Sequence, residues 1–121
     1  MTRAPAYLNG RTIANLAAEI GDRFGAQRLH PGLAPLANAR LSEHIAGARH
    51  LVLLLLDGAG SAQIEALCPR GALASMRVCE LDSTFPSSTA PAVTTFASGA
   101  SPGEHAVTGW HLWSPMHRAV V

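Results

Sequence analysis

The stretch His50-Leu-Val-Leu-Leu-Leu-Leu-Asp57-Gly58 decides the expected fold class of this 121-residue chain. Its six consecutive aliphatic residues show no alternation of apolar and polar positions, which is typical of a strand buried on both faces. Strands of this kind lie in the centre of parallel sheets that helices cover on both sides. The run therefore predicts an α/β protein with a mainly parallel sheet.

The segments on either side of this strand carry helical patterns. In residues 11–24 the apolar residues recur at the spacing of an amphipathic helix, and Gly25 is placed to end it. Residues 36–47 predict a second helix upstream of the strand. Residues 61–75 predict a weaker helix after it, interrupted at residues 69–71.

Further downstream the pattern returns to strand and then to helix. Residues 76–81 alternate enough to predict a second strand, and residues 90–98 carry a helical stripe that Gly99 ends. We expect Trp110 and Trp113, three residues apart, to pack. Helices and strands in this order indicate a layered α/β fold, with a mainly parallel sheet and flanking helices.

The composition narrows the classes of function. Hydrophobic residues form 48% of the chain, enough to bury a core, and charged residues only 14%, against about 25% in typical domains. A net charge of +1 gives no electrostatic reason to bind nucleic acid or an anionic membrane. The longest apolar run is far shorter than the roughly 18 residues that span a bilayer. We expect a soluble, cytoplasmic protein with no nucleic-acid or membrane partner.

Residues that often bind metals have simpler interpretations here. Cys68 and Cys79 fit neither a disulfide framework nor a C-x-x-C zinc knuckle, so we interpret them as small buried hydrophobic residues. His105, His111 and His117 recur every six residues, which is not the spacing of metal-binding histidine pairs. We interpret them as loop or partly buried histidines.

Asp57 is the first residue that could carry chemistry. It follows the predicted buried strand directly, and ligands of open α/β sheets bind outside the carboxyl ends of the strands. A carboxylate there could hold a metal ion, although an Asp-Gly pair alone is more often a simple turn. The absence of lysine excludes a P-loop, and the sequence from Gly58 to Gln63 departs from the dinucleotide-binding pattern G-x-G-x-x-G.

Thr89 is the second candidate, just before the predicted helix 90–98. Its simplest role is that of a helix N-cap, with Pro91 in the first turn. The same position places its hydroxyl beside free backbone N–H groups, where a phosphate binds and an alkoxide is stabilised. A metal ion would make this hydroxyl a nucleophile. Asp57 and Thr89 are expected at one edge of the sheet, so they could share one metal ion.

Several motifs occur in an order that resembles the N-terminal part of the nucleotide pyrophosphatase/phosphodiesterase family, within the alkaline phosphatase superfamily. In that family an apolar strand ends in a metal-binding Asp, and a Phe-Pro-x-x-Thr segment presents a nucleophilic Thr at a helix start. A segment ending in Pro-x-x-His follows. The resemblance covers roughly residues 49–113. The matching segments are LLLLDG at 53–58, FPSSTAPAVTTFASG at 85–99, PGEH at 102–105 and TGW at 108–110.

The resemblance implies an alkaline phosphatase-like hydrolase of phosphoester, phosphodiester or pyrophosphate bonds in small-molecule substrates. It implies two divalent metal ions, usually zinc, about 4 Å apart, with Asp57 and Thr89 binding one of them. Thr89 would attack phosphorus to form a covalent phospho-threonine, which water would then release. Nucleotide-cleaving members often carry Asn three residues after the nucleophile. Ala92 stands there instead, which points away from nucleotide substrates.

The resemblance also implies a division into a helical lead-in, residues 1–48, and the N-terminal part of the catalytic domain, residues 49–121. The family's remaining Asp and His ligands lie far downstream, and His105 matches a histidine that binds no metal. We therefore expect a truncated, inactive chain with an incomplete second metal site. Its exposed apolar surface would favour oligomers or aggregation.

Two alternatives stay open. One is a sulfatase, phosphomutase or phosphonate hydrolase of the same superfamily. The other is a non-catalytic, truncated α/β module that keeps the scaffold without turnover.

Overall fold

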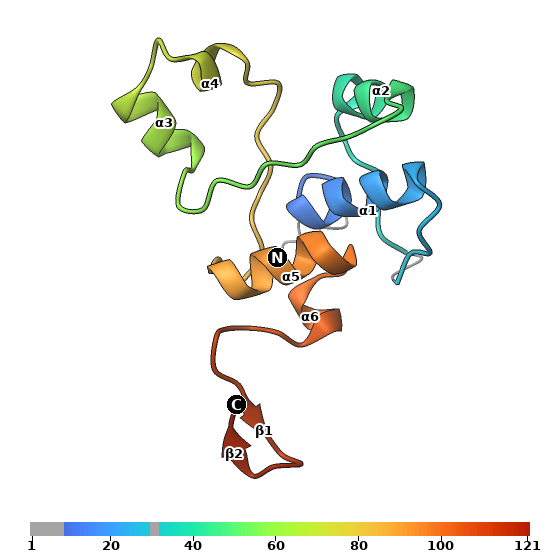
Figure 1. The fold of residues 1–121 in the computed structure, drawn as a ribbon, viewed down its shortest axis with the longest axis vertical. Coiled ribbons are helices and arrows are strands. Elements are labelled where there is room, and N and C mark those ends of the chain that lie inside the picture. The colour runs from blue at the N-terminus through green and yellow to red at the C-terminus, as the bar shows by residue number, and fades with distance from the viewer. Residues whose placement is uncertain (1–8, 30–31) are drawn as a thin grey trace, which may run out of the picture.

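The computed structural model describes residues 9–29 and 32–121 and is rich in helices (Figure 1). Residues 1–8 of the predicted lead-in lie outside the described residues. No helix of the described ranges is both long and apolar enough to cross a membrane. The elements are, in chain order, α1 (Ile13–Arg23), α2 (Ala39–Gly47), α3 (Ser61–Leu67), α4 (Ala72–Ser75), α5 (Thr89–Ser98), α6 (Pro102–His105), β1 (Trp113–Ser114) and β2 (Ala119–Val120).

Helix α1 forms where the sequence pattern predicts it. A capping box starts the helix: the Asn15 N–H donates to Thr12 Oγ1, and the Thr12 N–H donates to Asn15 Oδ1 at 3.0 Å. Beyond Arg23 the chain turns at Gly25, whose φ of +78° lies in the left-handed region that glycine adopts without strain. The predicted helix and its glycine stop are confirmed.

The core lies where α1 packs between α2 and α5 (Figure 1). Small side chains on α1 allow the backbone of α5 to approach closely, and Gly99 lies against Ala18 with a φ of +67°. Asn15, only 1% exposed, donates to the Ala34 carbonyl at 2.9 Å and ties the α1–α2 connection to the core. The buried hydrophobic residues are Ala14, Ala17, Ala18, Leu33, Leu36, Ile45 and Ala100.

The predicted parallel sheet is absent from the residues that the structure describes. Residues 51–56 form no strand, and Val52 and Leu54 are 92% and 77% exposed. Residues 76–81 form no strand either, and the parallel pairing described is one isolated bridge between Thr12 and Asp82. An apolar strand is buried only if strands pair along both edges and helices cover both faces. Among residues 9–29 and 32–121, no strand pairs with residues 51–56.

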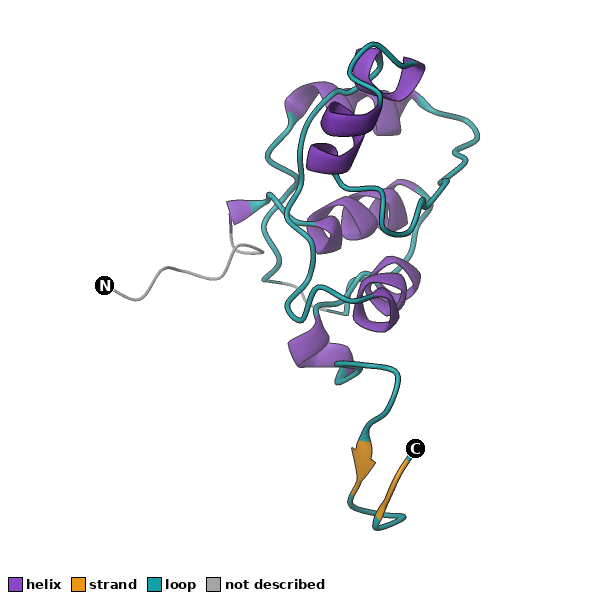
Figure 2. Cartoon of the chain, turned by 90° about the vertical axis from the view of Figure 1, so that its left-hand side faces the viewer, coloured by secondary structure: helices purple, strands orange, loops and turns teal. Residues whose placement is uncertain are grey.

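The described sheet is instead a two-stranded antiparallel hairpin, in which Trp113 pairs with Val120 and Ser114 with Ala119. Figure 2 shows strand only in this C-terminal hairpin, which projects away from the helices. Trp110 and Trp113 are 72% and 63% exposed, so the expectation that they pack is wrong. A hairpin that projects from the helices has no second layer to cover these rings.

The segment between the run and α5 agrees with the sequence in part. Helices α3 and α4 are separated at residues 68–71, which confirms the predicted interruption. Both cysteines are free thiols and neither is buried: Cys79 is partly exposed and Cys68 is exposed. The interpretation of both as buried residues is therefore wrong. Cys68 directly follows α3, which has no buried residue.

Candidate active site

Thr89 was predicted as the N-cap of a helix over residues 90–98, but it is the first residue of α5, which begins one residue earlier than predicted. Ser88 is the N-cap, with φ −129° and ψ 166°, and makes no side-chain capping bond. Helix α5 continues through the buried Pro91 and ends at Gly99, as the sequence predicts. Because Thr89 does not cap the helix, its hydroxyl is available to groups outside α5.

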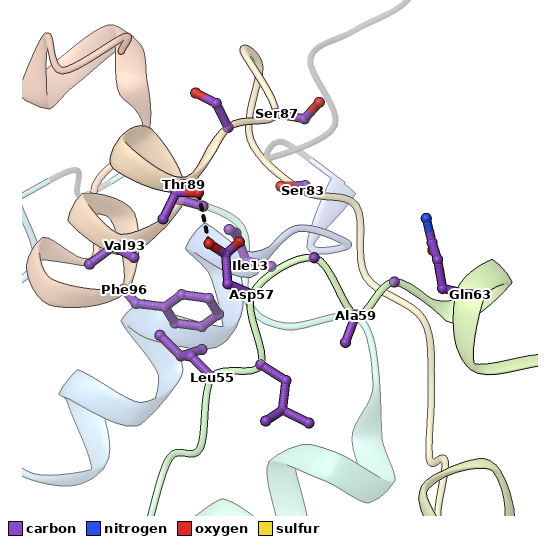
Figure 3. Close-up of a pocket in the computed structure, with 15 residues that line it drawn as sticks. Ile13, Leu55, Asp57, Ala59, Gln63, Ser83, Ser87, Thr89, Val93 and Phe96 are labelled. Carbon is purple, nitrogen blue, oxygen red and sulfur yellow. Dashed lines mark hydrogen bonds between the residues drawn. The ribbon is translucent and has the colours of Figure 1, made fainter. Parts of the chain in front are cut away.

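The group it meets is Asp57. Thr89 Oγ1 donates a hydrogen bond of 2.9 Å to Asp57 Oδ2 (Figure 3). Asp57 lies in the turn after the aliphatic run, and Gly58 follows with a φ of +69°, which bends the chain sharply beside the carboxylate. The structure thus brings together both predicted site residues, although they are 32 positions apart in the sequence.

The start of α5 adds backbone donors beside this pair. The first intrahelical bond of α5 runs from the Ala92 N–H to the Ser88 carbonyl at 3.2 Å. The N–H groups of Thr89 and Ala90 precede that bond, and groups in this position have no partner within a helix. They lie at the positive end of the helix dipole, where an anionic oxygen is stabilised.

Asp57 and Thr89 face a cavity of about 590 Å³ (Figure 3). Thr89, Ala92, Val93 and Phe96 form one wall of it, at the i, i+3, i+4, i+7 spacing of a single helix face. Asp57 is the one ionisable side chain among the described lining residues. The other lining residues are Ile13, Leu55, Leu56, Gly58, Ala59, Gly60, Gln63, Ser83, Ser87 and Ser88.

The sequence reasoning missed the polar residues of this cavity. Ser83 and Ser87 lie on the segment that leads into α5, and Gln63 lies on α3 (Figure 3). The density of serine and threonine in residues 83–101 was the available signal. Such residues are also common in loops, because their side chains hydrogen-bond the nearby backbone. The density alone therefore does not indicate which hydroxyls face a cavity.

The pair fits part of a metal site. A hydroxyl and a carboxylate oxygen that already meet within hydrogen-bond distance are suitable neighbours in one ligand shell. Zinc sites, however, use three or four protein ligands. Within residues 9–29 and 32–121, no group of three or more His, Cys, Asp and Glu residues is placed to hold a metal ion. Among the described residues, Asp57 and Thr89 are therefore suited to provide two ligands to one metal ion, fewer than a complete zinc site requires.

The histidines lie away from the cavity. His105 contacts Thr95 of α5, and His117 contacts Ser114 Oγ at 2.9 Å within the hairpin. His111 is exposed on the segment that leads into β1. None of the three lines the cavity that holds Asp57 and Thr89.

A hydroxyl at a helix start, hydrogen-bonded to a carboxylate in an open cavity, is an arrangement found in hydrolases that form a covalent intermediate. A model of the type I phosphodiesterase / nucleotide pyrophosphatase family matches residues 51–120. This match spans more than half of the chain and includes both Asp57 and Thr89. The chain therefore belongs to the type I phosphodiesterase / nucleotide pyrophosphatase family, which confirms the resemblance. Comparisons with curated proteins and with solved structures found no match.

Proposed function

We propose that this chain supplies the nucleophile of a metal-dependent hydrolase that cleaves phosphodiester or pyrophosphate bonds. The observation that carries this proposal is the 2.9 Å hydrogen bond between Thr89 Oγ1 and Asp57 Oδ2 at the start of α5. A carboxylate 32 positions away in the sequence accepts the hydrogen bond of the Thr89 hydroxyl. The pair lines a cavity large enough for a small phosphoester.

In the proposed reaction, Thr89 Oγ attacks phosphorus in line with the leaving group. An oxygen–phosphorus bond forms to Thr89, and the bond to the leaving oxygen breaks and leaves its electron pair on that oxygen. Asp57 Oδ2 accepts the hydrogen bond of the Thr89 hydroxyl and takes up its proton as the oxygen–phosphorus bond forms. A water molecule then attacks the phospho-threonine from the opposite side, the bond between Thr89 Oγ and phosphorus breaks, and a proton returns to Thr89 Oγ.

Backbone groups hold the phosphoryl oxygens in this scheme. The N–H groups of Thr89 and Ala90 would donate to a non-bridging oxygen, where negative charge develops in the transition state. Ala92, three residues after Thr89, lines the cavity with a methyl group and offers no side-chain donor to the phosphoryl oxygens. This lack of a side-chain donor favours small phosphoesters over nucleotides as substrates.

The family implies divalent metal ions, and zinc suits these ligands. Asp57 and Thr89 would hold one of the ions, which would supply Lewis acidity to the hydroxyl and neutralise charge on the reacting oxygens. Two ligands are fewer than zinc requires. We propose that the 121-residue chain can undergo the first step once but does not turn over substrate.

An activated aryl phosphodiester and zinc, added to the full chain, test the nucleophile. We expect an adduct that intact-mass spectrometry detects and fragmentation places on Thr89. Thr89→Ala should lose the adduct, whereas Thr94→Ala should keep it, because the Thr94 hydroxyl is bonded to the Ala90 carbonyl of its own helix. Equal labelling of wild type and Thr89→Ala would contradict the proposal.

The same samples test the proposed lack of turnover. Release of aryl alcohol should stop near one equivalent per chain. Release of many equivalents that depends on Thr89 would support the nucleophile and overturn the proposed inactivity. Tight binding of zinc without any adduct would instead favour the non-catalytic module.

A further inference from the structure

Helix α5 has two rows of residues with different roles. Thr89, Ala92, Val93 and Phe96 face the cavity. Pro91 and Thr95, four residues apart, are the buried residues of α5, and the Thr95 side chain is 0% exposed. Because the rows lie on different faces of one helix, any rotation of α5 at the buried row also moves Thr89 at the cavity.

The buried hydroxyl of Thr95 has a specific partner in α6. Thr95 Oγ1 lies 3.1 Å from His105 Nε2. The other ring nitrogen, Nδ1, accepts a hydrogen bond of 3.0 Å from the Val107 N–H. A backbone N–H can only donate, so Nδ1 carries the lone pair and Nε2 carries the proton. The direction follows: His105 Nε2–H donates to Thr95 Oγ1.

The element that carries His105 is itself held in place. At the N-cap of α6 the Ser101 N–H and hydroxyl donate to Glu104 Oε2 at 2.7 and 2.8 Å, in a capping box. Ala106 follows His105 with a φ of +60°, and this turn brings the Val107 N–H back to the ring. The hydrogen bond from the Val107 N–H therefore fixes the orientation of the His105 ring, independently of its contact with Thr95.

We propose that His105 is a positioning residue for Thr89. Its Nε2–H bond to the buried Thr95 sets the rotation of α5 about its axis, and this rotation aims the Thr89 hydroxyl at Asp57. The inference rests on the proposed role of Thr89 as nucleophile. His105 lies outside the cavity and acts only through α5.

Two NMR measurements on the full chain test this role without any need for turnover. Long-range ¹H–¹⁵N correlations identify the protonated ring nitrogen of His105, and we expect a proton on Nε2 in the wild type. Three-bond couplings report the χ1 rotamer of Thr89, and we expect one dominant rotamer. A proton on Nδ1 would overturn the proposal.

Two matched pairs of variants connect His105 to Thr89. Thr95→Ser keeps the hydroxyl and should keep the single Thr89 rotamer. Thr95→Val removes the hydroxyl, so the Thr89 couplings should become averaged over several χ1 rotamers. In His105→Gln the amide donor extends about as far from the backbone as His105 Nε2 and should keep the single Thr89 rotamer. In His105→Asn the side chain is too short to reach Thr95, so the Thr89 couplings should again become averaged. An unchanged rotamer in folded Thr95→Val or folded His105→Asn would overturn the proposal. If Thr95→Val does not fold, the His105 pair and the wild-type tautomer decide.

Adduct formation separates this inference from the proposed function. If both hold, His105→Asn forms the Thr89 adduct about a hundredfold more slowly than wild type, the loss expected from a misplaced reacting group. The concentration of ester at half-maximal rate stays unchanged. A wild type that forms no adduct contradicts the proposed function, while the couplings still decide whether His105 orients Thr89.

Discussion

Helix α5 and the aliphatic run at residues 51–56 each bring one residue to the candidate site, but they are held in place very differently. Helix α5 packs against α1 and α6 and keeps Thr95 fully buried. The run is extended, and Leu53 and Leu55, its two least exposed leucines after Leu51, are still 45% and 44% exposed. The nucleophile candidate therefore rests on packed structure, whereas the carboxylate rests on a turn and one hydrogen bond.

This difference shows what each part of the site depends on. Thr89 is placed by contacts that form within residues 9–29 and 32–121. Asp57 is placed by the Gly58 turn and by Thr89 itself, without the sheet that its sequence predicts. Substitutions in the two regions should therefore have unequal effects.

Glycine substitutions should reveal the largest difference. A Cβ at Gly10 would lie 2.1 Å from the Pro35 carbonyl oxygen, and its φ is +71°. We expect Gly10→Ala to lower the free energy of unfolding by about 3 kcal/mol or more. Gly58 has a φ of +69° but open space around it, so Gly58→Ala should cost only about 1–2 kcal/mol. Urea unfolding followed by circular dichroism measures both. Gly10 is hydrogen-bonded to Ala37 in the packed helical part of the chain, so equal losses would remove the distinction between that part and the exposed run.

The hydroxyl of Thr95 should have the next largest effect. Thr95→Val leaves the His105 Nε2–H without its acceptor in a buried place, so we expect a loss of about 1–3 kcal/mol. Thr94→Val is the control, since the Thr94 side chain bonds its own helix and is partly exposed. It should change stability by no more than about 0.5 kcal/mol. A loss as large for Thr94→Val would mean that the pair with His105 adds nothing.

Polar substitutions in the run should change association more than stability. We propose that the exposed residues 52–56 of the run cause the chain to oligomerise or aggregate. Val52→Lys with Leu54→Lys should change the free energy of unfolding by no more than about 0.5 kcal/mol, yet shift the chain toward monomer in analytical ultracentrifugation. A wild type that sediments as a sharp monomer and unfolds cooperatively would refute this.

The ion pair of Asp22 and Arg28 should have the smallest effect. Hydrogen bonds from the Arg28 guanidinium hold the pKa of Asp22 below its ordinary value, against a smaller opposing effect of burial. The pair stabilises the fold above the unfolded pKa of about 3.9 and loses this contribution as the pH falls through the lower folded pKa. Because Asp22 is 41% exposed, we expect at most about 0.5 kcal/mol.

The measurement is the difference in unfolding free energy between wild type and Asp22→Asn at pH 7 and at pH 2.5. The difference should shrink at the lower pH, because the unfolded wild-type carboxyl is protonated there and must release its proton to form the ion pair on folding. A difference that grows toward acid would contradict the assigned direction of the pKa.

Local patterns predicted local structure well in this chain. The helices at residues 11–24 and 90–98 follow from apolar spacing, and glycine stops them because these turns need a positive φ. The strand at residues 51–56 was not confirmed, because a strand depends on partners that no local pattern shows. Propensity predicts the extended backbone, while pairing is a property of the neighbours.

The site shows the same division. The meeting of Asp57 and Thr89 was predicted from the ends of an expected parallel sheet. The contact is present, while the described part of the chain forms no parallel sheet. The pair of Thr95 and His105 was missed, because it arises from the left-handed turn at Ala106 and the packing of α6 on α5. Neither feature has a spacing in the sequence that points to it.

The rate at which Thr89 is labelled in Asp57→Asn, compared with wild type, shows whether the Asp57 carboxylate activates the Thr89 hydroxyl. Both chains would receive the same activated aryl phosphodiester and zinc, and intact-mass spectrometry would follow the adduct with time. If the carboxylate prepares the hydroxyl for attack, Asp57→Asn should label Thr89 about a hundredfold more slowly. Equal rates would contradict the proposed activation of Thr89 by Asp57. A label on Ser87 or Ser88 in the wild type would contradict the assignment of Thr89 as the nucleophile.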